Sequence, residues 1–238
     1  MSIMSPIIKL IIIINVFIRF TIAQPTIIRC CFGSAIVENS KIYVGGGLTG
    51  GEDENIYTDD FFSFDLTVPF STNNMHFDVH KNVPIKVIAH TLVYAKNAKG
   101  GNIYLFGGHR ESPMGDPIYG YDPRLNAWSS ITPKIRDGVK MPIESDTKII
   151  GVTDSSLGTI YIFDNGTMFI YDVWNNFWDI GKTAPFSLHY YAAVMLNTSE
   201  IAYIGGYDDT STVSMEQVKY QIQWIHTCVK NHFNEFIF

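Results

Sequence analysis

A short apolar run that ends in glycine recurs along this chain of 238 residues, and the recurrence constrains the fold more than any other feature. The clear copies are KIYVGGG at residues 41–47, NIYLFGGH at 102–109 and IAYIGGY at 201–207. A divergent copy, TIYIFDNG, spans residues 159–166 and has Asp-Asn in place of the glycine pair. The paired positions begin at residues 46, 107, 164 and 205, so the copies are 61, 57 and 41 residues apart. Spacing of this order indicates a repeat architecture.

Each copy belongs to a longer unit of strand-like runs. A first run precedes every copy and ends in a turn: FGSAIV before ENS, HTLVYA before KNAKGG, KIIGVT before DSSLG and YYAAVML before NTSE. Such turn residues between two strand-like runs predict a β-hairpin. A third run follows each of the first three copies, and these runs end in Asp65, Asp122 and Asp172. Trp128 lies six residues after Asp122, and Trp178 lies six residues after Asp172. Trp224 is the candidate counterpart in the fourth copy. The predicted unit is therefore four short strands.

This unit resembles the kelch-repeat family of β-propellers. The matching residues are Gly46, Gly47, Gly107, Gly108, Gly205, Gly206, Phe64, Asp65, Tyr121, Asp122, Tyr171, Asp172, Trp128 and Trp178. Glycine allows a sharp backbone turn without a Cβ clash, aspartate accepts backbone N–H groups, and tryptophan fills the wedge between blades.

The resemblance implies an all-β fold, a kelch-type β-propeller with about four blades at residues 28–80, 85–135, 145–182 and 187–228. Kelch propellers usually close with more than four blades, and the fourth unit looks incomplete, so we expect a partial or open propeller. The tail, residues 229–238, has no repeat character.

The first glycine run also fits the dinucleotide fingerprint G-x-G-x-x-G at Gly45, Gly47 and Gly50, with Asp65 as an acidic residue further on. A phosphate site would need a helix directly after the glycines. The following GEDENIYTDD has no helical period, its acidic residues would repel a pyrophosphate, and the lysine of a P-loop is absent. The net charge of −6, without a basic cluster, also argues against nucleic acid. We therefore expect no nucleotide cofactor and no nucleic-acid partner.

The N-terminus predicts a targeting segment. Residues 7–18 are nearly all apolar, and Thr21 and Ala23 suit a signal peptide, residues 1–23, cleaved before Gln24. Because Lys9 interrupts the apolar run, an uncleaved single-span anchor is the alternative, and only then would the chain be attached to a membrane. Secretion would make the sequons at Asn165 and Asn197 usable for glycosylation.

The three cysteines are Cys30, Cys31 and Cys228. In a secreted chain, Cys30 or Cys31 could form a disulfide with Cys228, and the alternative is that all three remain thiols.

Some kelch propellers are copper-radical oxidases of the galactose oxidase type, so a remnant of such an oxidase is the alternative function that the resemblance implies. That site needs two tyrosines, one of them joined to a cysteine, and two histidines. The histidines here suit surface or turn positions better than ligand positions, and neither G-x-S-x-G nor H-E-x-x-H occurs. The acidic pairs Asp59–Asp60 and Asp208–Asp209 suit solvated loops better than a Ca²⁺ site. We therefore expect no enzyme activity, no metal and no cofactor.

The connections between second and third strands remain as candidate binding loops. Those at residues 48–58, 109–116 and 207–213 should open on one face. Their candidate residues are Glu52, Asp53, Glu54, His109, Arg110, Asp208 and Asp209. The sequence thus predicts an extracellular interaction module for an unidentified protein or glycan, and the acidic loops favour a basic partner.

Overall fold

The computed structural model describes residues 29–50, 56–69, 76–98, 100–112, 115–139, 149–154, 158–164, 167–183, 191–196 and 201–204. Every regular element in these ranges is a β-strand, and none of the resulting sheets closes on itself. The prediction of an all-β fold is therefore confirmed for the described part of the chain. The same ranges hold no helix with the length and apolarity that crossing a bilayer requires. The predicted signal peptide and the tail lie outside them.

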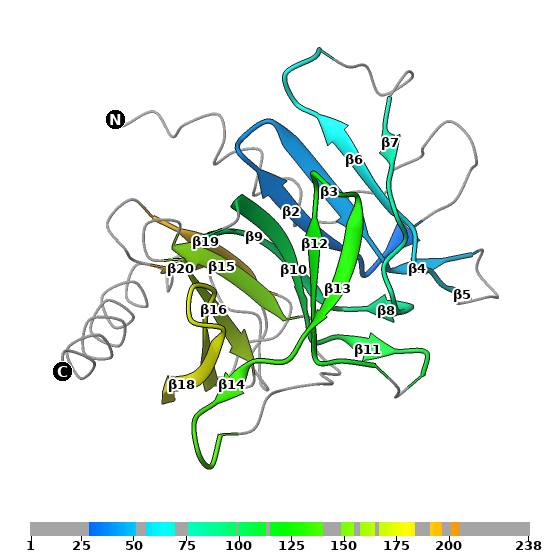
Figure 1. Cartoon of the computed structure of the whole chain (residues 1–238). Coiled ribbons are helices and arrows are strands. Elements are labelled where there is room, and N and C mark those ends of the chain that lie inside the picture. Colours follow the sequence, from blue (N-terminus) through cyan, green and yellow to red (C-terminus); the bar gives the residue numbers. More distant parts are fainter. Residues whose placement is uncertain are drawn as a thin grey trace.

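Four sheets succeed one another along the chain, each antiparallel between consecutive strands (Figure 1). The first sheet contains β2 (Gly33–Val37), β3 (Lys41–Gly45), β6 (Phe61–Asp65) and β7 (Asp78–Val79). The second contains β9 (Thr91–Asn97), β10 (Gly100–Phe106), β12 (Ile118–Asp122) and β13 (Ala127–Ile131). The third contains β15 (Ile150–Asp154), β16 (Thr159–Asp164), β17 (Thr167–Asp172) and β18 (Phe177–Thr183). The fourth has two described strands, β19 (Ala192–Met195) and β20 (Ile201–Ile204).

Six further short strands lie at the margins of these sheets. β1 (Arg29–Cys30), β4 (Leu48–Thr49) and β5 (Ile56–Tyr57) form one ribbon, and β8 (Val87–Ile88) pairs with β11 (His109–Arg110) in another. β14 (Lys134–Ile135) leaves the second sheet and joins the outer edge of the third, parallel to β18.

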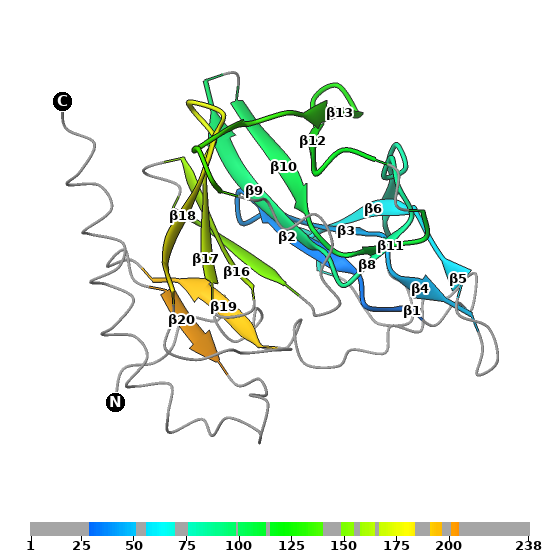
Figure 2. The same cartoon turned by 90° about the horizontal axis from the view of Figure 1, so that it is seen from below.

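The four sheets are arranged around their first strands. β2 lies against β9, β9 against β15, and β15 against β19, so the first strands lie side by side in chain order (Figure 2). Each first strand is also the edge of its own sheet, and the later strands extend outward from it.

Apolar side chains on both faces of the strands hold successive sheets together. Tyr43 and Phe61 of the first sheet pack with Leu105 and Tyr121 of the second. A second cluster joins the second sheet to the third, and a third cluster joins the third sheet to the fourth. Because both faces of an inner sheet are covered, its strands are continuous apolar runs rather than alternating ones. The burial pattern of β17 shows this, with four consecutive buried residues from Met168 to Tyr171.

The antiparallel order gives every sheet two distinct ends. At one end, the first strand connects to the second and the third strand connects to the fourth. We call this end the turn end. The opposite end, where second strands connect to third strands, is the loop end. β4, β5, β8 and β11 all lie at the loop end (Figures 1 and 2).

Candidate functional site

The described glycine pairs lie at the loop end, where one sheet meets the segment that enters the next. Gly46 and Gly47 have φ angles of 62° and 104°, and Gly107 and Gly108 have angles of 59° and 87°, all in the region that favours glycine. A Cβ on Gly108 would lie 2.5 Å from the carbonyl oxygen of Ile88. The N–H of Gly47 donates to the carbonyl oxygen of Val87 at 2.8 Å. These glycines therefore serve close packing of backbone on backbone, and the third pair, Gly205–Gly206, lies outside the described residues.

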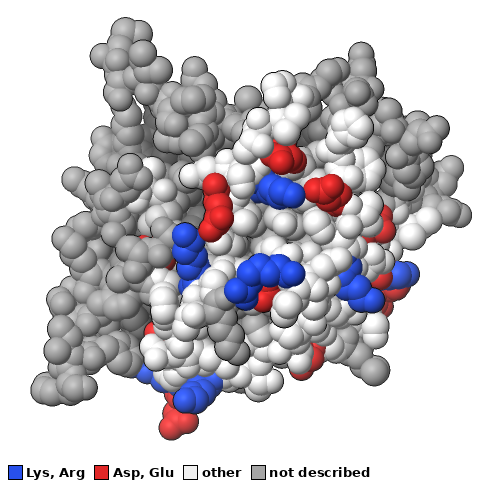
Figure 3. Space-filling view, turned by 45° about the horizontal axis from the view of Figure 1, so that its top comes forward, with Lys and Arg blue, Asp and Glu red and all other residues white. Residues whose placement is uncertain are grey.

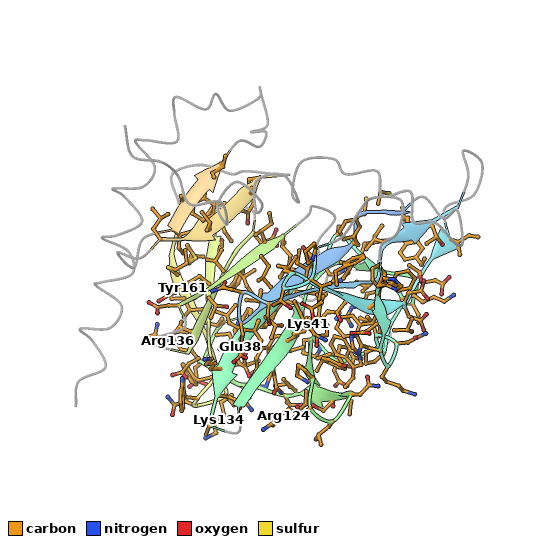
Figure 4. All side chains as sticks on the ribbon, turned by 90° about the horizontal axis from the view of Figure 1, so that it is seen from above. Glu38, Lys41, Arg124, Lys134, Arg136 and Tyr161 are labelled. Atoms are coloured by element: carbon orange, nitrogen blue, oxygen red, sulfur yellow. The ribbon has the colours of Figure 1, made fainter. Side chains whose placement is uncertain are left out.

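The three repeated aspartates close the turns between third and fourth strands at the turn end. Asp65 accepts the N–H of Thr67 at 2.8 Å, and Asp122 accepts that of Arg124 at 2.9 Å. Asp172 accepts the N–H of Trp174 at 2.9 Å. Hydrogen bonds from the side chain of Arg124, labelled in Figure 4, lower the pKa of Asp122 to about 2. Each carboxylate thus replaces a backbone acceptor in its turn.

The same turns contain two asparagines that the sequence interpretation missed. Tyr121 and Tyr171 donate their hydroxyls to Oδ1 of Asn126 and Asn176 at 3.0 and 2.9 Å. Asn176 also donates its Nδ2 to the carbonyl oxygen of Thr132, before the third sheet begins, at 3.0 Å. The shared spacing Asp-x-x-x-Asn-x-Trp, at residues 122–128 and 172–178, is the signal that could have revealed them.

The two tryptophans lie at successive joints between sheets but differ in burial. Trp178 is 1% exposed between the second and third sheets, with its ring 5.9 Å from Phe106 and 5.7 Å from Phe169 between centroids. Trp128 is half-buried between the first and second sheets, 5.0 Å from Phe61, and its Nε1 donates to the carbonyl oxygen of Lys81 at 2.9 Å.

The candidate binding loops of the first two sheets lie together at the loop end. The β4–β5 hairpin and the β8–β11 ribbon come from these two sheets, and the rings of Tyr57 and His109 lie 6.1 Å apart. His109 is exposed, as a binding residue must be. Arg110 is instead 5% exposed and donates to the carbonyl oxygen of Asp116 at 2.9 Å, so it shapes the loop from within.

The third sheet contributes no such loop. β16 ends at Asp164 and β17 begins at Thr167, and these two residues pair, so the divergent copy of the glycine run forms a direct hairpin. Several candidate residues lie outside the described ranges: Glu52, Asp53, Glu54, Asp208, Asp209, the sequons at Asn165 and Asn197, and Cys228. Cys30 and Cys31 are both exposed.

A cavity of about 280 Å³ lies where the four first strands converge. Residues of β2, β9, β15 and β19 line it, and its described lining includes no Asp, Glu, Lys or Arg. Two hydrogen bonds join the strands beside this cavity. The Thr91 hydroxyl accepts the N–H of Gly151 at 3.0 Å, and the Thr153 hydroxyl donates to the carbonyl oxygen of Tyr94 at 2.9 Å. These bonds tie the second sheet to the third, and the lining offers no charge with which to fix an ion.

A serine and a histidine meet in the joint between the first and second sheets. Ser63 Oγ lies 2.8 Å from Nε2 of His80, whose ring stacks on Tyr43 with a centroid distance of 5.1 Å. Burial lowers the pKa of His80, so its neutral form is favoured. Ser63 is 1% exposed, so its hydroxyl is shielded from solvent. The pair is therefore suited to holding the joint rather than to nucleophilic catalysis.

No metal centre occurs among the described residues, since no three His, Cys, Asp or Glu side chains in them could share an ion. On the face seen in Figure 3, acidic and basic side chains are interspersed. Protein-family models and curated proteins were both compared with the chain, and neither comparison gave a match.

Proposed function

We propose that the chain is an arc of a kelch-type β-propeller that acts outside the cell as a binding module. The propeller proposal is supported by four-stranded antiparallel sheets stacked in chain order around their first strands. The glycine pairs, the Asp-closed turns and the tryptophans between sheets add to this support. The residues that would carry the secretory signal lie outside the described ranges, so the location rests on the sequence.

The loop end is the proposed binding face, and the contact between Tyr57 and His109 is the observation that carries this proposal. It brings together connections that lie more than fifty residues apart in the chain, on two different sheets. Loops presented side by side on a rigid scaffold are a common form of binding surface. The internal bond of Arg110 to Asp116 pre-organises the second loop, which reduces the entropy lost on binding.

The partner that this face suits is a protein or a glycan with basic groups. In the sequence, Glu52, Asp53 and Glu54 fall between β4 and β5, and Asp208 and Asp209 follow β20. Complementary charge would raise the association rate and make binding sensitive to salt. The copper-oxidase alternative has no specific structural observation in its favour.

The test uses the secreted chain against a glycan microarray and a panel of lysine-rich and arginine-rich peptides. We expect retained probes to dissociate at least tenfold faster from the Tyr57→Ala, His109→Ala double variant. The D53N, E54N, D208N, D209N variant should bind more weakly and lose salt dependence. The matched control is Leu125→Ala with Trp174→Ala, two exposed residues at the turn end, which should bind normally. Equal binding by all variants, or retention of no probe, would remove the basis for the loop-end proposal.

N-terminal sequencing of the secreted chain tests the location. A chain that starts at Gln24 supports the cleaved signal, whereas a membrane-retained chain that starts at Met1 supports the anchor.

A further inference from the structure

The first sheet has one apolar face with no partner sheet among the described residues. Three of the four apolar clusters combine residues of two successive sheets, as packed joints require. The fourth cluster, which we call the one-sided cluster, contains Ile42, Val44, Phe62 and Phe64 with Phe32, Ile36, Leu66 and Phe77 around them. All of these residues belong to the first sheet or to its flanking segments.

The one-sided cluster is nevertheless buried. Ile42, Val44, Phe62 and Phe64 are at most 8% exposed. A sheet face that was open to water would leave its large side chains far more accessible, because only lateral neighbours would cover them. No described residue of another sheet belongs to this cluster, so the face is suited to a covering segment.

The fourth sheet faces this cluster. The central cavity is bounded by Ala193–Met195 of β19 and also by Phe32, Ile36 and Ile42 of the one-sided cluster. The fourth sheet has only two described strands where the others have at least four, and 34 residues follow Ile204. A strand added to β20 would extend the fourth sheet outward along this face.

Residues 218–224, VKYQIQW, have the pattern of such a strand. Apolar residues at 218, 220, 222 and 224 alternate with Lys219, Gln221 and Gln223, which is typical of a strand with one buried face. The segment begins 14 residues after β20 ends. In the first and second sheets, the third strand begins 16 and 12 residues after the second ends. Its position and its length therefore suit a third strand of the fourth sheet. This assignment replaces the sequence-based match of Trp224 to Trp128 and Trp178, which the structure places in fourth strands.

We propose that residues 218–224 pair with β20 and that their apolar row, Val218, Tyr220, Ile222 and Trp224, covers the one-sided cluster. The outer face of the third sheet does not need this apolar row as a cover, because it is already packed against residues of the fourth sheet, namely Tyr191, Ala193, Ile201 and Tyr203. The polar row faces away from the cluster. The first and last sheets of the chain thereby hold each other, and the inner edge of the arc is closed by its own C-terminal segment.

Photo-cross-linking of the full secreted chain tests this proposal in both directions. A benzophenone amino acid replaces Tyr220 in one variant and Phe77 in another, and mass spectrometry identifies the cross-linked peptides. We expect the probe at 220 to reach peptides with residues 32–36, 42–44, 62–64 or 77, and the probe at 77 to reach 218–224. The matched control places the probe at Gln221, in the polar row, and should give none of these products.

Other outcomes overturn the proposal. A product of twice the chain mass would show that a second copy covers the face. Attachment of the probe at 77 to residues 1–28 or 184–190, or absence of the expected products from both sites, would show that another segment does.

A second measurement keeps the proposal testable if a probe disturbs folding. Ile222→Asp should lower the melting temperature by about 4 °C or more and increase the binding of an apolar dye, because it places a charge on the one-sided cluster. Gln223→Asp is the matched control and should shift it by less than about 2 °C. Equal shifts in the two variants would contradict the assignment of the apolar row.

Discussion

The glycine pair after the second strand of the second sheet gives the sharpest test of close backbone packing at the loop end. Gly108 has a φ of 87°, and a Cβ there would lie 2.5 Å from the carbonyl oxygen of Ile88 and 2.7 Å from Cγ2 of Val87. A backbone carbonyl cannot rotate away like the end of a long side chain. Gly108→Ala therefore adds a clash to the conformational cost of a left-handed alanine.

Gly138 provides the matched control. Its φ is 81°, close to that of Gly108, but nothing lies within 4 Å of a Cβ built on it. Both alanine variants should lose roughly 1–2 kcal/mol of unfolding free energy from the backbone conformation. Only Gly108→Ala should lose a further ~1–3 kcal/mol from the forced shift of packed atoms.

Urea unfolding followed by tryptophan fluorescence measures both variants against the parent chain. We expect Gly108→Ala to be less stable than Gly138→Ala by about 1–3 kcal/mol, with unchanged m values. Equal losses in the two variants would refute the idea that this glycine exists for close approach of its backbone to the β8 segment. A larger loss in Gly138→Ala would refute it more strongly, since its Cβ meets nothing.

Three further predictions concern the joints between sheets. Trp178→Ala should cost about 3–5 kcal/mol in urea unfolding because its ring is fully buried, whereas Trp128→Ala should cost less because it is half-buried; equal costs would contradict this contrast. Asn176→Gly keeps the φ of 50° accessible but removes the hydrogen bonds to Tyr171 and Thr132. It should lower the free energy of unfolding by about 1–3 kcal/mol, and a loss below about 0.5 kcal/mol would show that these bonds add no stability. The pKa of His80 is lower in the folded chain than in the unfolded chain. As the pH falls below about 6.5, the unfolded chain therefore binds a proton at His80 before the folded chain does. The free energy of unfolding should decrease with falling pH until the pH passes the pKa of His80 in the folded chain. His80→Gln should remove that part of the pH dependence in urea titrations at pH 5 to 8, and an unchanged pH profile would exclude His80 as its source.

Much of the strand framework was predictable from local sequence patterns. The three runs that end in Asp65, Asp122 and Asp172 are the third strands β6, β12 and β17. Their aspartates accept turn N–H groups because a short carboxylate placed directly after a strand reaches the backbone two residues on. Both features depend only on neighbouring residues, so a single sequence carries them.

The candidate site was less predictable because it depends on contacts between distant segments. Arg110 follows a glycine pair and looks like a loop cation, yet the fold buries it against the carbonyl oxygen of Asp116. The ribbons β4–β5 and β8–β11 pair over only two residues per strand, too few for a recognisable alternation. The cavity at the first strands likewise requires four separate sheets to converge, and no stretch of sequence records that convergence.

The parallel strand β14 has a consequence for dividing the chain into parts. It lies directly after the second sheet in sequence, yet it hydrogen-bonds to β18, the last strand of the third sheet. A fragment cut between the two sheets at residue 132 or earlier keeps this edge covered, whereas a cut after residue 136 exposes β18. The third sheet should therefore be expressed, duplicated or exchanged together with β14. This structural unit begins earlier than the repeat visible in the sequence, because it includes the segment that leaves the preceding sheet.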